Sequence, residues 1–200
     1  MAVPSYKIAM LPPPGKLVAP DGFPADPHPV GAPKIFLDAM DVRTKVFCDE
    51  QKCSLEAELD EDDPRSWHWV AYQTAGPNLD QPVSVIRIVP PPHGPHPNGL
   101  SDPNEEPYVK LGRVATLANA RGKGFSRLLT EEAFRWLGAH KDEVAPGWNG
   151  LTLAHAQVDV EKLYAKLGFE TDDKLGRWDE EGIEHLGMWK RVVGIHGHPS

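Results

Sequence analysis

Cysteine is scarce in this chain, which has only Cys48 and Cys53 among its 200 residues. Two cysteines are too few for a disulfide framework, and this pair lies in what reads as one helix and its exit, where a bridge would need special geometry. A reduced pair is therefore expected. No apolar run approaches the roughly 20 residues of a membrane span, and residues 1–10 lack the basic and apolar regions of a signal peptide. The chain is thus predicted to be cytoplasmic, with no membrane partner.

Positive charge is also in deficit, because 21 Lys and Arg stand against 29 Asp and Glu, for a formal net charge of −8. This balance argues against a nucleic-acid partner. The charges are unevenly placed. Residues 108–127 carry five basic residues and no acid, whereas residues 49–63 carry eight acids and one base. The basic segment suits a polyanion, and the acidic segment is either a site for a cation or a solvated loop.

Proline is abundant, and its residues gather in two stretches, 12–33 and 90–107, which are predicted to be long surface loops. Elsewhere the apolar spacing predicts strands and helices. The predicted strands are 6–11, 67–72, 83–89, 108–117 and 151–154, with closing strands from 169 and over 187–192. The predicted helices are 34–52, one from 125 and one around 160–167. This succession fits a single α/β (α+β) domain over residues 1–200, with a mixed central sheet flanked by helices.

A basic turn with two glycines, Arg121-Gly122-Lys123-Gly124, stands between an apolar strand and an amphipathic helix. A helix start leaves backbone N–H groups unpaired, and the helix dipole favours negative charge there. The glycines let the backbone approach a ligand without interference from a Cβ atom, while Arg121 and Lys123 add positive charge. The pattern predicts a site for a phosphate-bearing cofactor.

This turn resembles that of the GNAT superfamily of acetyl-CoA-dependent N-acetyltransferases. Residues 121–126 match the family's pattern of Gln or Arg, two residues, Gly, one residue, then Gly or Ala, with Ser126 in the last place. Residues 163–169, LYAKLGF, match the later helix that ends in a Gly-Phe pair. The resemblance spans about residues 35–192 and implies a GNAT-like fold that carries the two proline-rich loops as insertions.

Three further stretches narrow the resemblance to the ElaA/YjcF-like branch of the superfamily. The first is VFCDEQKC at 46–53, which the acidic run follows. The second is the His-Ala-Gln of 155–157, and the third is EGIEHLGM at 181–188. Four motifs in the family's order, at 46–53, 121–126, 163–169 and 181–188, are a far more specific signal than a lone glycine turn, and the His-Ala-Gln fits the same branch.

The resemblance implies that the chain binds acetyl-CoA. The backbone of Val114, Ala115 and Thr116 would hold the pantetheine arm, and one strand N–H would polarise the thioester carbonyl, as a preorganised donor does. The residues expected to hold the pyrophosphate are Arg121, Gly122, Lys123, Gly124, Phe125 and Ser126. Serine is a good residue for a helix start, and its hydroxyl is expected to face the phosphate.

The resemblance also implies catalytic roles. Tyr164 is expected to be the general acid that protonates the departing thiolate, although a tyrosine on an apolar helix stripe is also typical of a core. Glu50 is the first candidate for the base that takes a proton from the amine. The further candidates for the base are Asp60, His68, His155 and His185.

The expected acceptor is a small primary amine of the amino-sugar or polyamine type, because the acidic run would attract an ammonium ion. The residues expected to line its site are Gln51, Asp60, His68, Arg113, His155, Gln157 and His185. A structural role is equally open for each histidine, and Arg113 is equally well explained by ion pairing with the acidic run. No Cys/His set has zinc spacing, so no metal is predicted in spite of His196 and His198.

Two other functions stay open at this point. In the first, the chain catalyses the same reaction but the acceptor is a protein lysine or N-terminus. In the second, the chain is a non-catalytic acyl-CoA-binding module. A homodimer is suggested by analogy alone, since sheet edges in this superfamily often pair across subunits.

Overall fold

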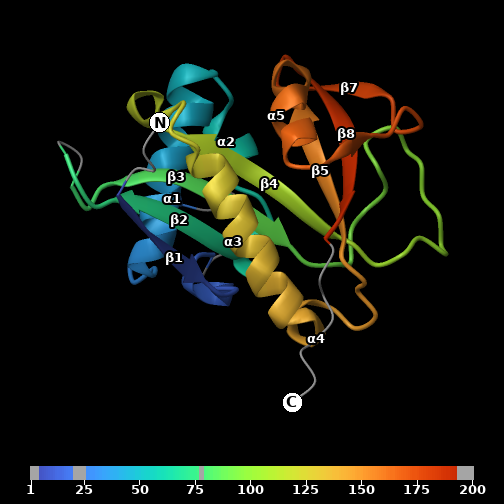
Figure 1. Ribbon diagram of the computed structural model, residues 1–200, viewed down its shortest axis with the longest axis horizontal. Helices are drawn as coiled ribbons and strands as arrows, with labels where there is room; N and C mark the ends of the chain where they lie inside the picture. Colours follow the sequence, from blue (N-terminus) through green and yellow to red (C-terminus); the bar gives the residue numbers. More distant parts are fainter. Residues whose placement is uncertain (1–4, 20–25, 77–78, 193–200) are drawn as a thin grey trace. The chain divides into compact units, whose positions relative to one another are not determined.

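The computed structural model describes three stretches of chain, residues 5–19, 26–76 and 79–192. These residues form two compact units, whose elements are labelled in Figure 1. The first unit comes from Met1–Val89 and Arg113–Ala133, and the second from Pro90–Gly112 and Phe134–Ser200. The prediction of a single domain over residues 1–200 stays a prediction.

Strands β1 (Tyr6–Leu11), β2 (Trp67–Gln73) and β3 (Pro82–Val89) form the antiparallel part of the first unit. Strands β2 and β3 are buried along nearly their whole length, as their almost continuous apolar sequences require. Strand β4 (Val109–Thr116) follows β3 in the sheet, and its residues from Arg113 onward belong to the first unit.

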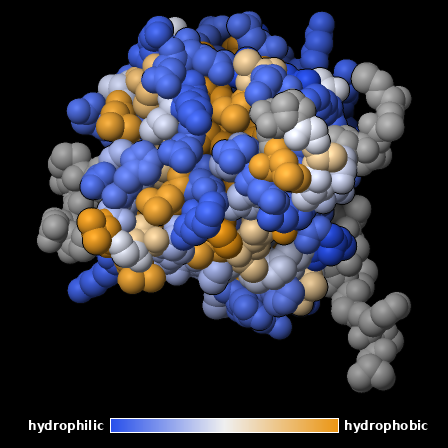
Figure 2. All heavy atoms as spheres, turned by 90° about the vertical axis from the view of Figure 1, so that its left-hand side faces the viewer, coloured by the Kyte–Doolittle hydropathy of each residue, from blue (hydrophilic) through white to orange (hydrophobic). Residues whose placement is uncertain are grey.

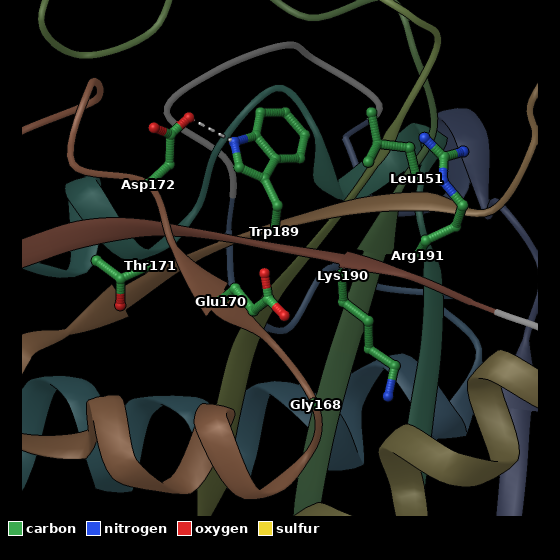
Figure 3. A pocket seen from close by; sticks show the side chains of 8 residues that line it. All are labelled: Leu151, Gly168, Glu170, Thr171, Asp172, Trp189, Lys190 and Arg191. Carbon is green, nitrogen blue, oxygen red and sulfur yellow. Dashed lines mark hydrogen bonds between the residues drawn. The ribbon is translucent and has the colours of Figure 1, made fainter.

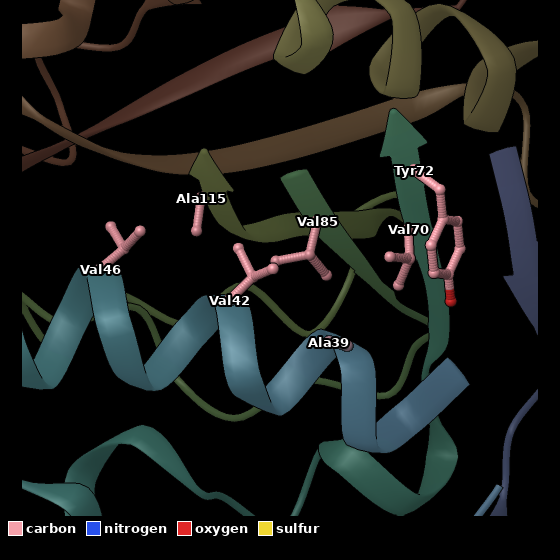
Figure 4. Close-up of a cluster of buried hydrophobic side chains, with 7 residues drawn as sticks. All are labelled: Ala39, Val42, Val46, Val70, Tyr72, Val85 and Ala115. Carbon is pink, nitrogen blue, oxygen red and sulfur yellow. The ribbon is translucent and has the colours of Figure 1, made fainter. Parts of the chain in front are cut away.

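Helix α1 (Lys34–Arg43) packs on these strands. Figure 4 shows Ala39, Val42 and Val46 pointing from the helical side toward Val85 and its buried neighbours on β2 and β4. The three side chains share one face because they are spaced by three and four residues. This hydrophobic layer holds the helix on the sheet.

The helix predicted over 34–52 is α-helical only in its first part, and its hydrogen-bonding pattern changes after Arg43. After α1 the chain continues as a π-helical segment, Thr44–Glu50, and then as the short helix α2 (Leu55–Glu58). The Ser54 side chain caps α2 by accepting a hydrogen bond from the Ala57 N–H. This arrangement places the acidic run around α2 and the turn that follows it.

The second unit is built on a mixed set of strands. The first part of β4 pairs in parallel with β5 (Leu151–Gln157), and β5 pairs antiparallel with β8 (Ile183–Arg191). Strands β6 (Glu170–Thr171) and β7 (Arg177–Glu180) both pair antiparallel with β8. The sheet therefore has eight strands of mixed direction, in agreement with the expected fold class.

Three helices complete the architecture. Helix α3 (Phe125–Ala139) contributes residues to both units, whereas α4 (Lys141–Val144) and α5 (Glu161–Lys166) lie in the second. Sequence reasoning missed α2, α4 and β7, which are four residues each. Among the described residues, no helix is long and apolar enough to cross a membrane.

The proline-rich segment 90–107 forms no helix or strand, as its composition predicted, but it is held in place by specific contacts. His93 stacks on Tyr108, with ring centroids 4.5 Å apart, and its Nε2 lies 2.9 Å from the Tyr108 carbonyl oxygen. The Asn98 side-chain amide donates to the carbonyls of Lys174 and Leu175, at 3.1 Å each. The segment is thus fastened to the second unit at several points.

The surface drawn in Figure 2 is mostly hydrophilic, and its hydrophobic residues form separate patches between polar ones. Such scattered apolar exposure is normal for a protein surface. It gives no sign, on that face, of a large apolar area.

Candidate active site

The glycine turn leads directly into helix α3 in the first unit. Gly122 and Gly124 have φ angles of +74° and +83°, which side-chain-bearing residues rarely adopt. A Cβ atom at either position would meet open space, so the backbone conformation and not crowding requires glycine. The turn is exposed, and the first turn of α3 contains no acidic residue. Its free N–H groups and the positive end of the helix dipole fit a phosphate group.

Buried side chains hold this turn in place. Ala120 and Phe125, on either side of it, are 0% and 1% exposed, and Phe125 meets the Tyr6 ring edge-on at 6.3 Å. The Ser126 hydroxyl lies 3.0 Å from the Thr116 hydroxyl, which in turn lies 2.8 Å from that of Ser84. Ser126 therefore ties α3 to β4 and β3, which is a different contact from the phosphate contact expected from the sequence.

The two basic residues of the turn are held by neighbouring groups. Arg121 donates from Nε to the Thr116 carbonyl at 2.9 Å, and its Nη2 lies 2.5 Å from Oε2 of Glu50. Lys123 donates to the Asn119 carbonyl at 3.0 Å. The structure thus brings a predicted cofactor ligand, Arg121, into contact with the predicted base, Glu50.

Strand β4 departs from regular strand conformation at Arg113, just before the residues expected to hold the pantetheine arm. Its parallel pairing with β5 runs from Val109 to Leu111 and ends there. Two residues later, Arg113 has a φ of +50°, a left-handed conformation typical of a β-bulge. The strand then continues through Val114, the buried Ala115 and Thr116.

A buried ionic cluster lies behind this break, and we call it the arginine cluster. It consists of Arg43, Arg87, Arg113, Glu58, Asp60 and Asp63. Arg43 is fully buried and donates to Glu58 at 2.5 Å and to Asp63 at 2.7 Å. Arg87 binds Asp60 with two nitrogens, at 2.6 and 2.8 Å. Three arginines and three carboxylates therefore neutralise one another.

Electrostatics in the arginine cluster favours the ionised carboxylates. Burial alone would raise the pKa of Asp63, but Arg43 and Arg87 outweigh it and hold that pKa well below its usual range. Burial also lowers the pKa of His68 to about 4, so this imidazole is neutral at physiological pH. The cluster as a whole carries no net charge at neutral pH.

These contacts favour a structural role for three residues that the sequence analysis placed in the acceptor site. Asp60 is bound by Arg87 and Arg113, so its charge is already compensated. His68 is 0% exposed, with Nε2 3.1 Å from the Asp63 carbonyl oxygen, which fits a structural role. Arg113 donates to Asp60 at 2.9 Å and to the Glu58 carbonyl at 3.1 Å, so ion pairing explains it. Three of the eight acids of the run, Glu58, Asp60 and Asp63, are thus bound by arginines, and two of these three are buried.

Tyr164 lies on helix α5 in the second unit and is 6% exposed. Its ring meets Phe169 edge-on at 5.7 Å, and the Phe169 N–H donates to the Tyr164 carbonyl. Gly168, with a φ of +85°, makes the turn between them possible. Burial raises the pKa of Tyr164, so the phenol stays protonated and able to donate at neutral pH.

Three residues expected to line the acceptor site, His155, Gln157 and His185, also lie in the second unit. Gln157 pairs with His185 across β5 and β8, and His185 pairs with Trp178 across β8 and β7. Directly paired residues point to the same face of a sheet, and so do alternate residues along a strand. These four side chains therefore share one face, which Glu180 joins at the end of β7.

Trp178 and Glu180 were missed by sequence reasoning because β7 was not predicted. The alternation in Arg177-Trp178-Asp179-Glu180, followed by a Glu-Gly pair, is a usable signal for a short hairpin. In the structure Glu181 and Gly182 both have positive φ, at 54° and 80°. The turn fixes the register that brings Trp178 opposite His185.

A shallow pocket of about 500 Å³ lies elsewhere on the second unit (Figure 3). Several of its polar side chains are already engaged. The Trp189 N–H donates to Asp172, Lys190 binds the Leu167 carbonyl, and Arg191 pairs with Glu106 at 2.6 Å. This pocket is therefore a poor candidate for the active site.

Metal binding finds no support in the described part of the chain. Its His, Cys, Asp and Glu residues form no group of three that could hold a metal ion. The histidines at 196 and 198 lie outside the described residues.

The chain as a whole can be compared with known proteins. A family model described as the acetyltransferase (GNAT) family matches residues 36–169. The chain belongs to this family and is an acyltransferase of a kind that uses acyl-CoA. The family expected from the sequence is confirmed.

Solved structures share the fold at low sequence identity. A candidate N-acetyltransferase from Lactobacillus plantarum has a TM-score of 0.63 and 22% identity over 94% of this chain and 99% of its own. An acyl-CoA N-acyltransferase from Pseudomonas aeruginosa has a TM-score of 0.61 and 22% identity over 93% of this chain and 99% of its own. Escherichia coli ElaA has a TM-score of 0.56 and 20% identity over 77% of this chain and 88% of its own. The expected GNAT fold is thereby confirmed.

Proposed function

We propose that this chain is an acetyl-CoA-dependent N-acetyltransferase that acts on a small primary amine. The observation that carries the proposal is the exposed glycine turn at the start of α3, where Gly122 and Gly124 have positive φ angles and the helix start leaves N–H groups without partners inside the helix. Family membership supports acyl transfer, and the turn supports a cofactor that carries phosphate groups.

The cofactor would lie along residues of the first unit. The N–H groups from Gly122 to Ser126 would bind its pyrophosphate, with the helix dipole adding to the attraction. Backbone groups of Val114 to Thr116 would bind its pantetheine arm, since the β5 pairing of β4 has ended by then. Acetyl-CoA, when bound, supplies the acetyl group as a thioester.

Two side chains would move protons. Glu50 would take a proton from the acceptor ammonium, because a charged amine has no lone pair with which to attack. Arg121, 2.5 Å from Glu50, fixes the carboxylate near the turn. Tyr164 would give its phenolic proton to the thiolate sulfur as it leaves, and its raised pKa means that the phenol holds this proton at neutral pH until then.

An assay of thiol release tests the proposal. Purified protein and acetyl-CoA are incubated with a panel of primary amines, including amino sugars and diamines, and with a panel of peptides. We expect release with small amines. Release with peptides alone would make the chain a peptide N-acetyltransferase, and binding of coenzyme A without any release would make it an acyl-CoA-binding module.

A further inference from the structure

Glu180 is the centre of a small cluster on the second unit that the proposed mechanism does not use. Its Oε1 accepts a hydrogen bond from the Trp178 indole N–H at 2.6 Å and lies 4.0 Å from Nδ1 of His155. Its Oε2 lies 3.9 Å from Nε2 of His185. Both distances to the histidines are too long for a hydrogen bond. The side chain is 45% exposed, so a ligand in solution can reach it.

The hydrogen bond of His185 defines which of its nitrogens can accept. Its Nδ1 lies 2.9 Å from the Ile183 carbonyl oxygen, and a carbonyl can only accept, so Nδ1 carries a proton. In the neutral imidazole Nε2 is then an acceptor. Two acceptors, Nε2 of His185 and Oε2 of Glu180, therefore face each other across 3.9 Å. A donor between them would satisfy both.

The aromatic rings around the carboxylate shape the rest of the cluster. Trp178 meets the His155 ring edge-on at 4.8 Å and lies nearly parallel to the His185 ring at 6.4 Å. Burial, together with the charge of Lys110 and the nearby His96, lowers the pKa of His155 to about 3. His155 is thus neutral at physiological pH and supplies no positive charge to balance Glu180.

We infer that Glu180 and His185, beside Trp178 and His155, form a subsite for a primary ammonium group of the acceptor. An ammonium group has three N–H donors, and one nitrogen can lie at about 2.8 Å from both facing acceptors. The carboxylate supplies the opposite charge, and the indole ring supplies an aromatic surface that attracts cations.

The chemistry of this subsite defines the acceptor further. A carboxylate stabilises the charged form of an amine, so the nitrogen held here stays protonated and is not the one that attacks the thioester. The acceptor therefore carries at least two amino groups, one held as an ammonium ion by Glu180 and the other acetylated. This inference rests on the proposed amine acetyltransferase activity.

A matched pair of acceptors tests the subsite. The diamine 1,5-diaminopentane and the monoamine 1-aminopentane have the same carbon chain and differ in the second amino group. In the thiol-release assay the wild type should prefer the diamine in kcat/KM by about tenfold or more, as expected for a hydrogen bond to a charged group. Glu180→Gln should remove most of that preference.

A control variant on the same hairpin makes the result specific. Glu184→Gln removes an exposed carboxylate of β8 that pairs with Arg177 at 3.2 Å, and it should keep the diamine preference. Equal use of the two amines by the wild type would overturn the inference, as would an unchanged preference in Glu180→Gln.

Calorimetry of 1,5-diaminopentane binding, without acetyl-CoA, separates this inference from the proposed function. Binding that is lost in Glu180→Gln, with no thiol release from any amine, would support the ammonium subsite and contradict the acetyltransferase proposal. Thiol release from amines, with no diamine binding that depends on Glu180, would overturn the subsite and leave the acetyltransferase proposal intact.

Discussion

The two units hold their acidic side chains in different ways. In the first unit, Glu58, Asp60 and Asp63 are matched by three arginines within hydrogen-bonding distance. In the second unit, the contacts that the structure describes for Glu180 are with an indole N–H and two imidazoles, none of them a permanent cation. Matched charges support a fold, whereas an unmatched and exposed carboxylate is available to a ligand.

This comparison changes where a cationic acceptor is expected to bind. The density of acids in residues 49–63 suggested an ammonium site, but Glu58 and Asp63 are buried, and all three of Glu58, Asp60 and Asp63 are paired with arginines. Glu180 stands in a second acidic stretch, Asp179-Glu180-Glu181, and has the geometry that the acidic run at 49–63 lacks. The number of acids in a segment is thus a weaker signal than the partners of each one.

The largest expected effect comes from breaking the arginine cluster. Arg43→Ala should lower the free energy of unfolding by about 3–5 kcal/mol, because Glu58 and Asp63 stay buried but lose the fully buried arginine that binds both of them. Urea denaturation followed by circular dichroism measures the change. Arg65→Ala removes a partly exposed ion pair with Asp62 and should cost less than about 1 kcal/mol. Equal losses in the two variants would show that the buried cluster is not what supports the first unit.

A change in the second unit should affect turnover more than stability. Tyr164→Phe should lower kcat by about ten- to a hundredfold, because it removes one proton donor. The KM for acetyl-CoA should stay within about twofold, since the proposed cofactor contacts lie in the first unit. Steady-state kinetics of thiol release gives both values. An unchanged kcat would assign Tyr164 to core packing alone.

The glycine turn is the part of the first unit that should affect binding. Gly124→Ala places a Cβ on a residue with a φ of +83°, at a cost of about 1–2 kcal/mol. We expect coenzyme A to bind about tenfold more weakly, as measured by calorimetry. Gly138 lies inside α3 and does not have a positive φ, so the Gly138→Ala variant should bind coenzyme A as the wild type does. A loss shared by both variants would point to general damage to α3.

The smallest effect expected is a dependence of stability on pH that arises in both units. His68 and His155 have pKa values near 4 and 3 in the folded chain, against about 6.5 when unfolded. As the pH falls below 6.5 the unfolded chain takes up protons that the folded chain does not, so stability decreases. The loss should be on the order of 1 kcal/mol for each histidine between pH 6.5 and 5.5.

Urea denaturation at the two pH values measures this loss, and His68→Gln should reduce it. A free energy of unfolding that is constant over this range would contradict the buried, neutral state of both histidines.

The elements that sequence reasoning found are those with local signals. The glycine turn was readable because positive φ, a helix start and basic residues all occur within a few positions, from Arg121 to Ser126. The strands were readable from continuous apolar runs, as in β3. Such signals do not depend on which distant segments meet in the fold.

The features that were missed depend on distant partners. Arg43, Arg87 and Arg113 stand far apart in the sequence, and only the fold brings them to the same three carboxylates. The same holds for Glu180, whose neighbours come from β5, β7 and β8. The change to a π-helical conformation at Thr44 has no local sequence signal that we can identify.

A calorimetric titration of the purified chain with coenzyme A tests the central claim most directly. The claim is that the free N–H groups of the glycine turn bind the phosphate groups of the cofactor. We expect saturable binding at one site per chain, weakened about tenfold by Gly124→Ala. Absence of any binding heat over a range of temperatures would contradict the account, because neither Tyr164 nor Glu180 would then have an acetyl transfer to serve.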